Sequence, residues 1–261
     1  MQLELGGKAA IVTGGSRGIG AAIAAELVRE GAAVCLVASD AGRLERAAAE
    51  IGRAGPGPVA WHQADLRAPG AADAAVAAAV DRLGRLDILV NSAGATRRGD
   101  FFALGDDDWT DGFALKLHGS VRMTRAAWPH LREAGGSVLN IVGVGAWTAT
   151  GEFAIGGSVN AALLHFTKAM ADIGRTQGVR VNAINPGRIQ TDRLSGNLAR
   201  MAAEQGVSVE EAAAGLLRAS GIQRFGAPQE IASVAAFLVS RQASFVHGAL
   251  VDVDGGETRG L

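Results

Sequence analysis

A glycine-rich segment near the N-terminus places the strongest constraint on the fold. Residues Thr13–Gly20 read TGGSRGIG, follow an apolar run over Ala9–Val12 and open an alanine-rich helical pattern over Gly18–Glu30. Glycines permit a tight turn there, and backbone N–H groups at the positive end of the helix can then approach a phosphate. A strand, a glycine turn and a helix in this order predict a site for the pyrophosphate of a dinucleotide.

The alternation of apolar run and helical pattern continues along the chain. It predicts strands over Ala9–Val12, Ala33–Val37, Val59–His62, Ile88–Asn91, Ser137–Ile141, Arg180–Ile184 and Ala249–Val253, and helices over Gly18–Glu30, Ala41–Arg53, Pro69–Leu83, Asp106–Glu133, Phe153–Gln177 and Pro228–Ser240. The runs are continuously apolar, as in parallel strands covered on both faces. We therefore expect an α/β fold, a Rossmann-type doubly wound parallel sheet in three α/β/α layers, as a single dinucleotide-binding domain over residues 1–261.

One segment departs from this rhythm. Thr191–Phe225 holds two short alanine-rich helical patterns and no strand, and it follows the carboxyl end of a predicted strand. Open α/β sheets bind ligands at that end, so the segment is predicted to form a lid over a substrate pocket with an apolar wall. The alternative is a surface excursion without a role in binding.

The charge balance and the single cysteine narrow the class of protein. Lys and Arg number 25 against 26 Asp and Glu, with no block of like charge, which argues against nucleic acid or an anionic membrane as partner. No apolar stretch reaches the roughly 18 residues of a membrane span, and the N-terminus lacks a signal-peptide pattern. Cys35 lies in an apolar run and is expected to be a buried, inert thiol; the histidines show no metal-ligand spacing. We expect a cytoplasmic, metal-free protein that binds a small molecule.

Further motifs follow the other predicted strands, and together they resemble one family. The spacing Thr-Gly-x-x-x-Gly-x-Gly is joined by Asp65-Leu66, Asn91-Ser92-Ala93-Gly94, Pro186–Thr191 (PGRIQT), Arg224–Gly226, Glu230–Ala232 and Asp254–Gly256. From about Leu5 to Gly256 the chain is similar to the short-chain dehydrogenases/reductases. The resemblance implies a nicotinamide dinucleotide bound by Gly14, Ser16, Arg17, Gly18, Ile19, Gly20, Ser39, Asp65, Leu66, Asn91, Ala93, Gly94, Pro186, Gly187, Ile189 and Thr191.

The end of the second predicted strand bears on which dinucleotide is bound. NAD-specific members of the family carry an acidic residue there, which accepts hydrogen bonds from the ribose. This chain has Ala38 and Ser39 at that place, with Asp40 one position late. Ser39 can donate to a 2′-phosphate, and Arg17 supplies a cation, so NADP is favoured over NAD. The alternative is that Arg17 is an ordinary solvated loop residue.

On this resemblance, the family's four catalytic residues, Asn, Ser, Tyr and Lys, are all replaced. The chain contains no tyrosine. Aligning the helix that continues to Phe166-Thr167-Lys168-Ala169 puts Gly156 at the tyrosine position and Asn160 at the lysine position. The serine position is then Gly143, and the asparagine position is Lys116.

The replacements predict a rebuilt centre in which an ammonium and an amide have exchanged places. A buried Lys116 can act as acid or base near neutrality, whereas an outward Lys116 would be an ordinary helix residue. Gly143 and Gly156 leave room for Trp147 or Phe153, for water or for substrate. Thr148 and Ser158 are further candidates for the catalytic site, while His118, about 200° from Lys116 around the helix, is expected to face elsewhere.

Three functions stay open from the sequence. The first is an NADP-dependent oxidoreductase with a non-standard active site acting on a carbonyl or alcohol. The second is a non-redox lyase, isomerase or hydratase on the same scaffold, with Lys116 as base. The third is a catalytically silent dinucleotide-binding protein or supporting subunit. The resemblance also implies a homotetramer or homodimer formed through the helices over Asp106–Glu133 and Phe153–Gln177 and the C-terminal strand.

Overall fold

Seven parallel strands form one sheet in a computed structural model that describes residues 2–259. Their order across the sheet is β3-β2-β1-β4-β5-β6-β7. Successive strands are added on one side of β1 up to β3 and on its other side from β4 onwards, so the topological switch point lies between β1 and β4. The strands are β1 (Ala9–Thr13), β2 (Ala33–Ala38), β3 (Val59–Gln63), β4 (Ile88–Asn91), β5 (Ser137–Ile141), β6 (Arg180–Pro186) and β7 (Leu250–Val253). The prediction of a doubly wound parallel sheet is confirmed, with strand ends shifted by at most two residues.

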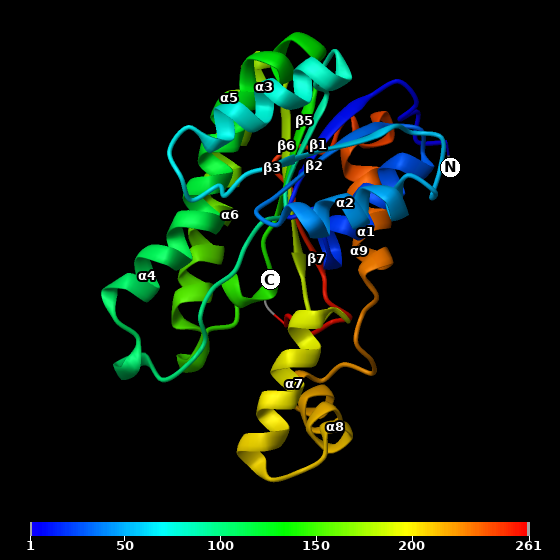
Figure 1. Ribbon diagram of the computed structural model, residues 1–261. Coiled ribbons are helices and arrows are strands. Elements are labelled where there is room, and N and C mark those ends of the chain that lie inside the picture. The colour runs from blue at the N-terminus through cyan, green and yellow to red at the C-terminus, as the bar shows by residue number, and fades with distance from the viewer. Residues whose placement is uncertain (1, 260–261) are drawn as a thin grey trace.

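Helices cover both faces of the sheet, as Figure 1 shows, with α1, α2 and α9 on one side and α3, α5 and α6 on the other. The helices are α1 (Gly18–Arg29), α2 (Ala41–Ile51), α3 (Ala71–Leu83), α4 (Asp106–Phe113), α5 (Gly119–Ala134), α6 (Ala154–Gln177), α7 (Asp192–Gln205), α8 (Val209–Ser220) and α9 (Pro228–Val239). None of these described helices has the length and apolar character needed to cross a bilayer.

The continuously apolar strands supply side chains to two separate hydrophobic cores, one on each face of the sheet. Neighbouring residues of a strand point to opposite faces, so Val12 packs in the core under α1 and α9, while Ile11 packs in the core under α3 and α5. Cys35 belongs to the second core and is fully buried. Burial raises the pKa of its thiol to about 11, against a smaller opposing effect of Arg82, so the thiol is inert as predicted.

The helical segment predicted over Asp106–Glu133 is present over Asp106–Ala134, but it is not a uniform α-helix. One π-helical turn, Ala114–His118, separates α4 from α5 along a continuous helical axis. The wide turn accommodates an extra residue, and it rotates the side chains that follow relative to a regular helix. Lys116 lies in the middle of this turn.

The segment Thr191–Phe225 folds as the helix pair α7 and α8, which projects beyond the carboxyl ends of the strands (Figure 1). It starts and ends at one place, because Ile189 and Gly226 form an isolated parallel bridge. The predicted pair of short helices is therefore present, and it is attached to the body at the edge where the strands end.

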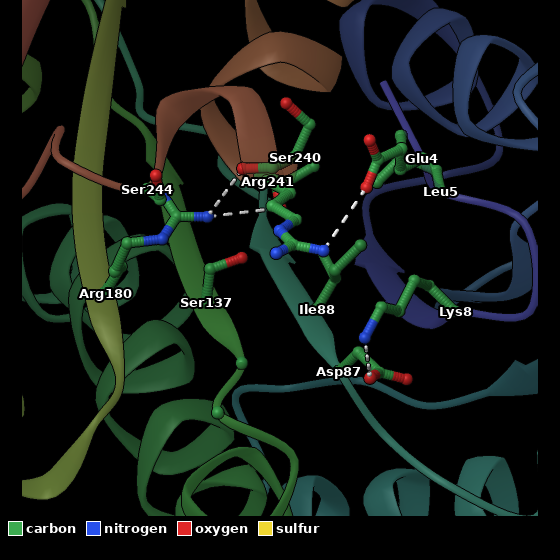
Figure 2. Close-up of a pocket in the computed structure, with 13 residues that line it drawn as sticks. Glu4, Leu5, Lys8, Asp87, Ile88, Ser137, Arg180, Ser240, Arg241 and Ser244 are labelled. Carbon is green, nitrogen blue, oxygen red and sulfur yellow. Dashed lines mark hydrogen bonds and ion pairs between the residues drawn. The ribbon is translucent and has the colours of Figure 1, made fainter. Parts of the chain in front are cut away.

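At the amino ends of the strands, charged side chains line a cavity of about 340 Å³ (Figure 2). The carboxylate of Asp87, only 3% exposed, accepts hydrogen bonds from Lys8 Nζ (3.1 Å), the Ala9 N–H (3.0 Å) and the Arg85 guanidinium (2.7 and 2.8 Å). Arg180 donates to backbone carbonyls at the end of α9. These contacts brace the amino ends of the strands.

Candidate functional site

Two loops that follow β1 and β4 pack together at the carboxyl edge of the sheet. Gly14 adopts a positive φ of 66°, and a Cβ there would lie 3.0 Å from the backbone of Ala93. The Thr13 hydroxyl oxygen accepts hydrogen bonds from the N–H groups of Ser92 (3.0 Å) and Ala93 (3.1 Å). The glycine-rich loop and the Asn91–Gly94 loop therefore form one continuous wall.

The first turn of α1 offers free hydrogen-bond donors beside this wall. No side chain caps the helix, and no acidic residue lies in its first turn. Arg17 is exposed, and its guanidinium lies 3.9 Å from Asp192 at the start of α7. A Cβ at Gly18 would touch the methyl group of Thr191 at 3.4 Å, so the two predicted ends of the cofactor site face each other. Uncapped N–H groups and a nearby cation fit a diphosphate.

The residues predicted to contact the adenosine end lie at the exposed end of β2 and beside β3. Asp40 is committed to capping α2, because its side chain accepts from the Arg43 N–H at 2.9 Å. Asp65 accepts from the Arg67 N–H at 3.1 Å, and Leu66 is buried against Gly119. Ser39 is exposed, and the neighbouring Asp40 carboxylate is engaged by the start of α2 and by the Arg43 guanidinium at 3.2 Å.

Buried amides join the strands beneath the site. Asn91 Nδ2 donates to Thr124 Oγ1 (3.2 Å) and to Asn140 Oδ1 (2.9 Å). Asn140 Nδ2 in turn donates to Thr167 Oγ1 (2.9 Å). The chain of contacts runs from β4 through β5 to α5 and α6, so the loop after β4 is held from below by hydrogen bonds rather than by apolar packing alone.

Lys116 points into the site. Its Nζ donates to the Val142 carbonyl at 2.5 Å, and its stem packs on Gly94, where an added Cβ would lie 2.9 Å from Cδ of the lysine. Burial, and secondarily the charge of Arg193, lower the pKa of Lys116 to about 7. The alternative of an outward, solvated lysine is therefore wrong.

Asn160, on α6, contacts the turn after β5 that also carries the Val142 carbonyl. It is 3% exposed, its Nδ2 donates to the Gly143 carbonyl at 3.4 Å, and its buried Oδ1 has no hydrogen-bond partner in the described structure. Lys116 and Asn160 thus bind the carbonyls of two successive residues, Val142 and Gly143. Gly143 has a φ of 136°, a conformation in which a side chain would be strained.

The space beside Gly156 is occupied by Phe153, whereas a Cβ added to Gly143 would lie 3.2 Å from Asn160 Nδ2. A Cβ added to Gly156 would overlap the Phe153 ring, and one added to Gly145 would lie 2.7 Å from its Cε1. The Arg98 guanidinium lies over the same ring, 3.9 Å from its centroid. Of the two bulky neighbours expected to fill the space, Phe153 does so, while half-exposed Trp147 donates to Asp252 Oδ1 at 3.3 Å instead.

Thr148 and Ser158 are not brought into this cluster. Both residues are exposed; the Thr148 hydroxyl donates to the Val144 carbonyl at 3.1 Å, and Ser158 makes no side-chain hydrogen bond within residues 2–259. His118 is also exposed, as expected. The described residues contain no group of three His, Cys, Asp or Glu side chains that could hold a metal.

Two arginines at the site were not predicted. The guanidinium of Arg193, from the first turn of α7, donates to the Gly94 carbonyl, and burial followed by the charge of Arg17 lowers its pKa. Arg98 extends from the loop after β4 onto Phe153. Neither residue belongs to a motif, and only their proximity to Gly94 and Thr191 in the sequence hinted at the site.

The comparisons with known proteins agree with this geometry. Residues 14–258 match the family model described as enoyl-(acyl carrier protein) reductase. An uncharacterized oxidoreductase of Mycobacterium tuberculosis is 36% identical, covering 98% of this chain and 94% of its own, and the 3-oxoacyl-[acyl-carrier-protein] reductase FabG of Vibrio harveyi is 33% identical, covering 97% and 98%. The crystal structure of L-sorbose reductase from Gluconobacter frateurii, complexed with NADPH and L-sorbose, has a TM-score of 0.95 at 31% identity and covers all of both chains. The chain belongs to the short-chain dehydrogenase/reductase family.

Proposed function

We propose that the protein is an NADP-dependent oxidoreductase that interconverts a carbonyl and an alcohol through a non-standard active site. The observation that carries the proposal is the Lys116 ammonium, which lies between the Asn91–Gly94 loop and the turn after β5 with a pKa of about 7. An ionisable group placed beside a dinucleotide groove and titrating near neutrality suits proton transfer.

The proposed cofactor site is the groove between the glycine-rich loop, the loop after β4 and the start of α7. Gly14, Ser16, Arg17, Gly18, Ile19 and Gly20 would hold the pyrophosphate, Ser39, Asp65 and Leu66 the adenosine, Asn91, Ala93 and Gly94 the ribose side, and Pro186, Gly187, Ile189 and Thr191 the nicotinamide. The preference for NADP rests on the lack of a free carboxylate at the end of β2, since Asp40 caps α2. The NADPH in the L-sorbose reductase structure supports the same choice.

The chemistry is divided between the cofactor and the chain's own residues. When bound, the nicotinamide would supply hydride chemistry at the carbon that interconverts between carbonyl and alcohol. In the reducing direction Lys116 donates its proton to the substrate oxygen, is left neutral and regains a proton from solvent. Asn160 positions the turn that carries the Val142 carbonyl, and it thereby fixes where the Lys116 Nζ lies. A general acid so placed is worth roughly 10² to 10⁴ in rate.

The missing phenol is compensated sterically rather than chemically. We propose that Gly143, Gly156, Asn160 and Lys116 stand where other members of the family carry Ser, Tyr, Lys and Asn. Phe153 supplies an apolar wall in place of the tyrosine ring but no proton. We further propose that the pair α7 and α8 closes as a lid, because Thr191 abuts Gly18 and Arg193 reaches Gly94, and that the protein forms a homodimer or homotetramer.

The proposal is tested by fluorescence titration with NADPH and NADH, followed by absorbance assays with a panel of ketones that includes L-sorbose. We expect tighter binding of NADPH than NADH and oxidation of NADPH by at least one ketone. Binding without turnover across the panel would contradict the oxidoreductase and would favour a silent dinucleotide-binding protein. Absence of binding by either nucleotide would contradict both.

A further inference from the structure

Three cationic side chains around the proposed reaction centre have no carboxylate partner. Lys116 binds the Val142 carbonyl, Arg193 binds the Gly94 carbonyl, and Arg98 lies on the Phe153 ring. Among residues 2–259, no Asp or Glu oxygen lies within salt-bridge distance of any of the three. A carbonyl or a ring face compensates a positive charge only in part, so the site carries a surplus of positive charge.

The nearby acidic side chains are already engaged elsewhere. Glu152 pairs with Arg200 (3.2 Å), and Glu257 pairs with Arg188 (2.9 Å). Asp192 lies 3.9 Å from Arg17 on the side of the glycine-rich loop. Arg200 is shared with Glu204 at 2.6 Å, so that group carries one net negative charge, and Glu152 acts on Arg98 from a distance without pairing with it.

Arg98 is the member of this group whose guanidinium lies on an aromatic ring rather than on a backbone carbonyl. Arg193 lies on the side of the glycine-rich loop, because it donates to the Gly94 carbonyl and its pKa is lowered by the charge of Arg17. Arg98 instead covers the ring that replaces the tyrosine. Arg98 is an exposed residue whose guanidinium is partly desolvated where it lies on the ring, so a ligand that enters beside Phe153 would contact it.

The surroundings of Arg98 repel its charge. Burial is the largest cause that lowers its pKa; Arg188, Arg200 and Arg193 lower it further, and Glu152 opposes them. Arg98 itself has no salt-bridge partner among residues 2–259, so an incoming oxyanion would offset this repulsion while it accepts hydrogen bonds from the guanidinium.

From this arrangement we infer that the substrate carries an oxyanion, a carboxylate or a phosphate, that is bound by Arg98 while the carbonyl lies at Lys116. The inference rests on the proposed function, since it names the substrate class of the same site. Arg98 acts as a specificity residue, and it selects the substrate without taking part in proton or hydride transfer.

Matched ketone pairs test the inference in kinetics. Acetoacetate is compared with methyl acetoacetate, and dihydroxyacetone phosphate with dihydroxyacetone, at constant ionic strength with NADPH. We expect kcat/KM for the anionic member of one pair to exceed that of the neutral member by about tenfold or more, with the preferred pair identifying carboxylate or phosphate. The substitution Arg98→Gln should remove this preference, chiefly through KM.

Arg97→Gln is the matched control, because Arg97 is the adjacent arginine but pairs with Asp108 at 2.8 Å. It should leave the preference unchanged. Equal or better turnover of both neutral ketones, or an equal loss on both members of a pair in Arg98→Gln, would overturn the inference and leave the oxidoreductase intact.

A binding measurement separates the failure of the two proposals. Thermal unfolding of the protein with NADP⁺ is followed with malonate, with inorganic phosphate and with sodium chloride of equal ionic strength. If no ketone is reduced, but malonate or phosphate raises Tm above the chloride value in the native protein and not in Arg98→Gln, the proposed activity fails and the oxyanion site stands. If neither anion exceeds chloride and no anionic ketone is preferred, the inference is wrong.

Discussion

Lys116 is held where its charge is poorly solvated. Its ammonium is enclosed between the loop after β4 and the Val142 carbonyl. The charge that shifts its pKa, that of Arg193, has the same sign. The single hydrogen bond to a carbonyl does not replace a full hydration shell, so the neutral amine becomes accessible near pH 7. The same residue therefore has a consequence for catalysis and one for stability.

The catalytic consequence is a pH dependence of ketone reduction. Because the charged form donates the proton, kcat should fall as pH rises through about 7. Lys116→Met should lower kcat by roughly 10² to 10³ and flatten this profile. Lys168→Met is the control, since Lys168 lies on α6 and donates to the Gly248 carbonyl at 2.6 Å, away from Lys116. An unchanged profile in Lys116→Met would remove the residue from the mechanism.

The thermodynamic consequence has a definite sign. The folded protein loses the Lys116 proton at about 7, whereas the unfolded chain keeps it up to 10.5, so between these values the unfolded state binds more protons. The free energy of unfolding should therefore rise with pH across this window. Lys116→Met should be the more stable protein at pH 6, by up to about 5 kcal/mol, with the difference shrinking towards pH 10. Urea denaturation at both pH values measures it.

Phe153 and Gly156 form the second residue-scale unit. Gly156→Tyr should destabilise the fold by about 1 to 3 kcal/mol, because a side chain there overlaps the Phe153 ring. Combining it with Phe153→Ala should cost less than the sum of the single changes, as measured by thermal or urea unfolding in a double-mutant cycle. Strict additivity of the two changes would show that the ring does not fill the tyrosine space.

At the scale of elements, the sequence predicts all seven strands but misses the π-helical turn between α4 and α5. Continuous apolar runs identify all seven strands, because each strand must supply side chains to two cores. The π-turn over Ala114–His118 escapes such a prediction. One inserted residue changes the hydrophobic period too little to be seen in a single sequence, although it decides where Lys116 points.

The amino edge of the sheet supplies an element-scale prediction. Burial alone would raise the pKa of Asp87, but hydrogen bonds from Arg85, the Ala9 N–H and Lys8 hold it below its usual range. Its contribution to stability is present above the pKa of an unfolded Asp, and is lost as pH falls through the lower folded value. Asp87→Ala should cost about 3 kcal/mol at pH 7 and progressively less below pH 4, measured by denaturation. Asp172→Ala, in an exposed pair with Arg175, should cost less than 1 kcal/mol.

At the scale of the whole molecule, the two edges of the sheet have different tasks. The carboxyl edge gathers the glycine-rich loop, Lys116, Asn160 and α7, while the amino edge carries the charged brace of Asp87 (Figures 1 and 2). Sequence motifs predicted the loops of the carboxyl edge, because backbone position follows from strand order. They missed Arg98 and Arg193, because the reach of a long side chain across a groove depends on packing that no local pattern encodes.

The helix pair α7 and α8 should respond to the cofactor as a unit. It is tied to the body at its base, through the Ile189–Gly226 bridge and the contact of Arg193 with Gly94, and along α7 through the Arg200–Glu152 ion pair. Binding of NADPH should slow amide hydrogen exchange in α7 by about tenfold or more and leave the buried strands β1 and β4 unchanged. Mass spectrometry of exchanged peptides measures this. Equal exchange of α7 with and without NADPH would contradict the proposed lid.

The ring of Phe153 over Gly156 also bears on how this chain can vary. A larger side chain at position 156 would enter a volume that is already taken, and the single variant would fold less well than the present chain. Enlarging position 156 therefore requires a coordinated reduction at position 153, and neither change is favourable alone. Packing couples the two positions, so they are expected to vary as a pair rather than independently.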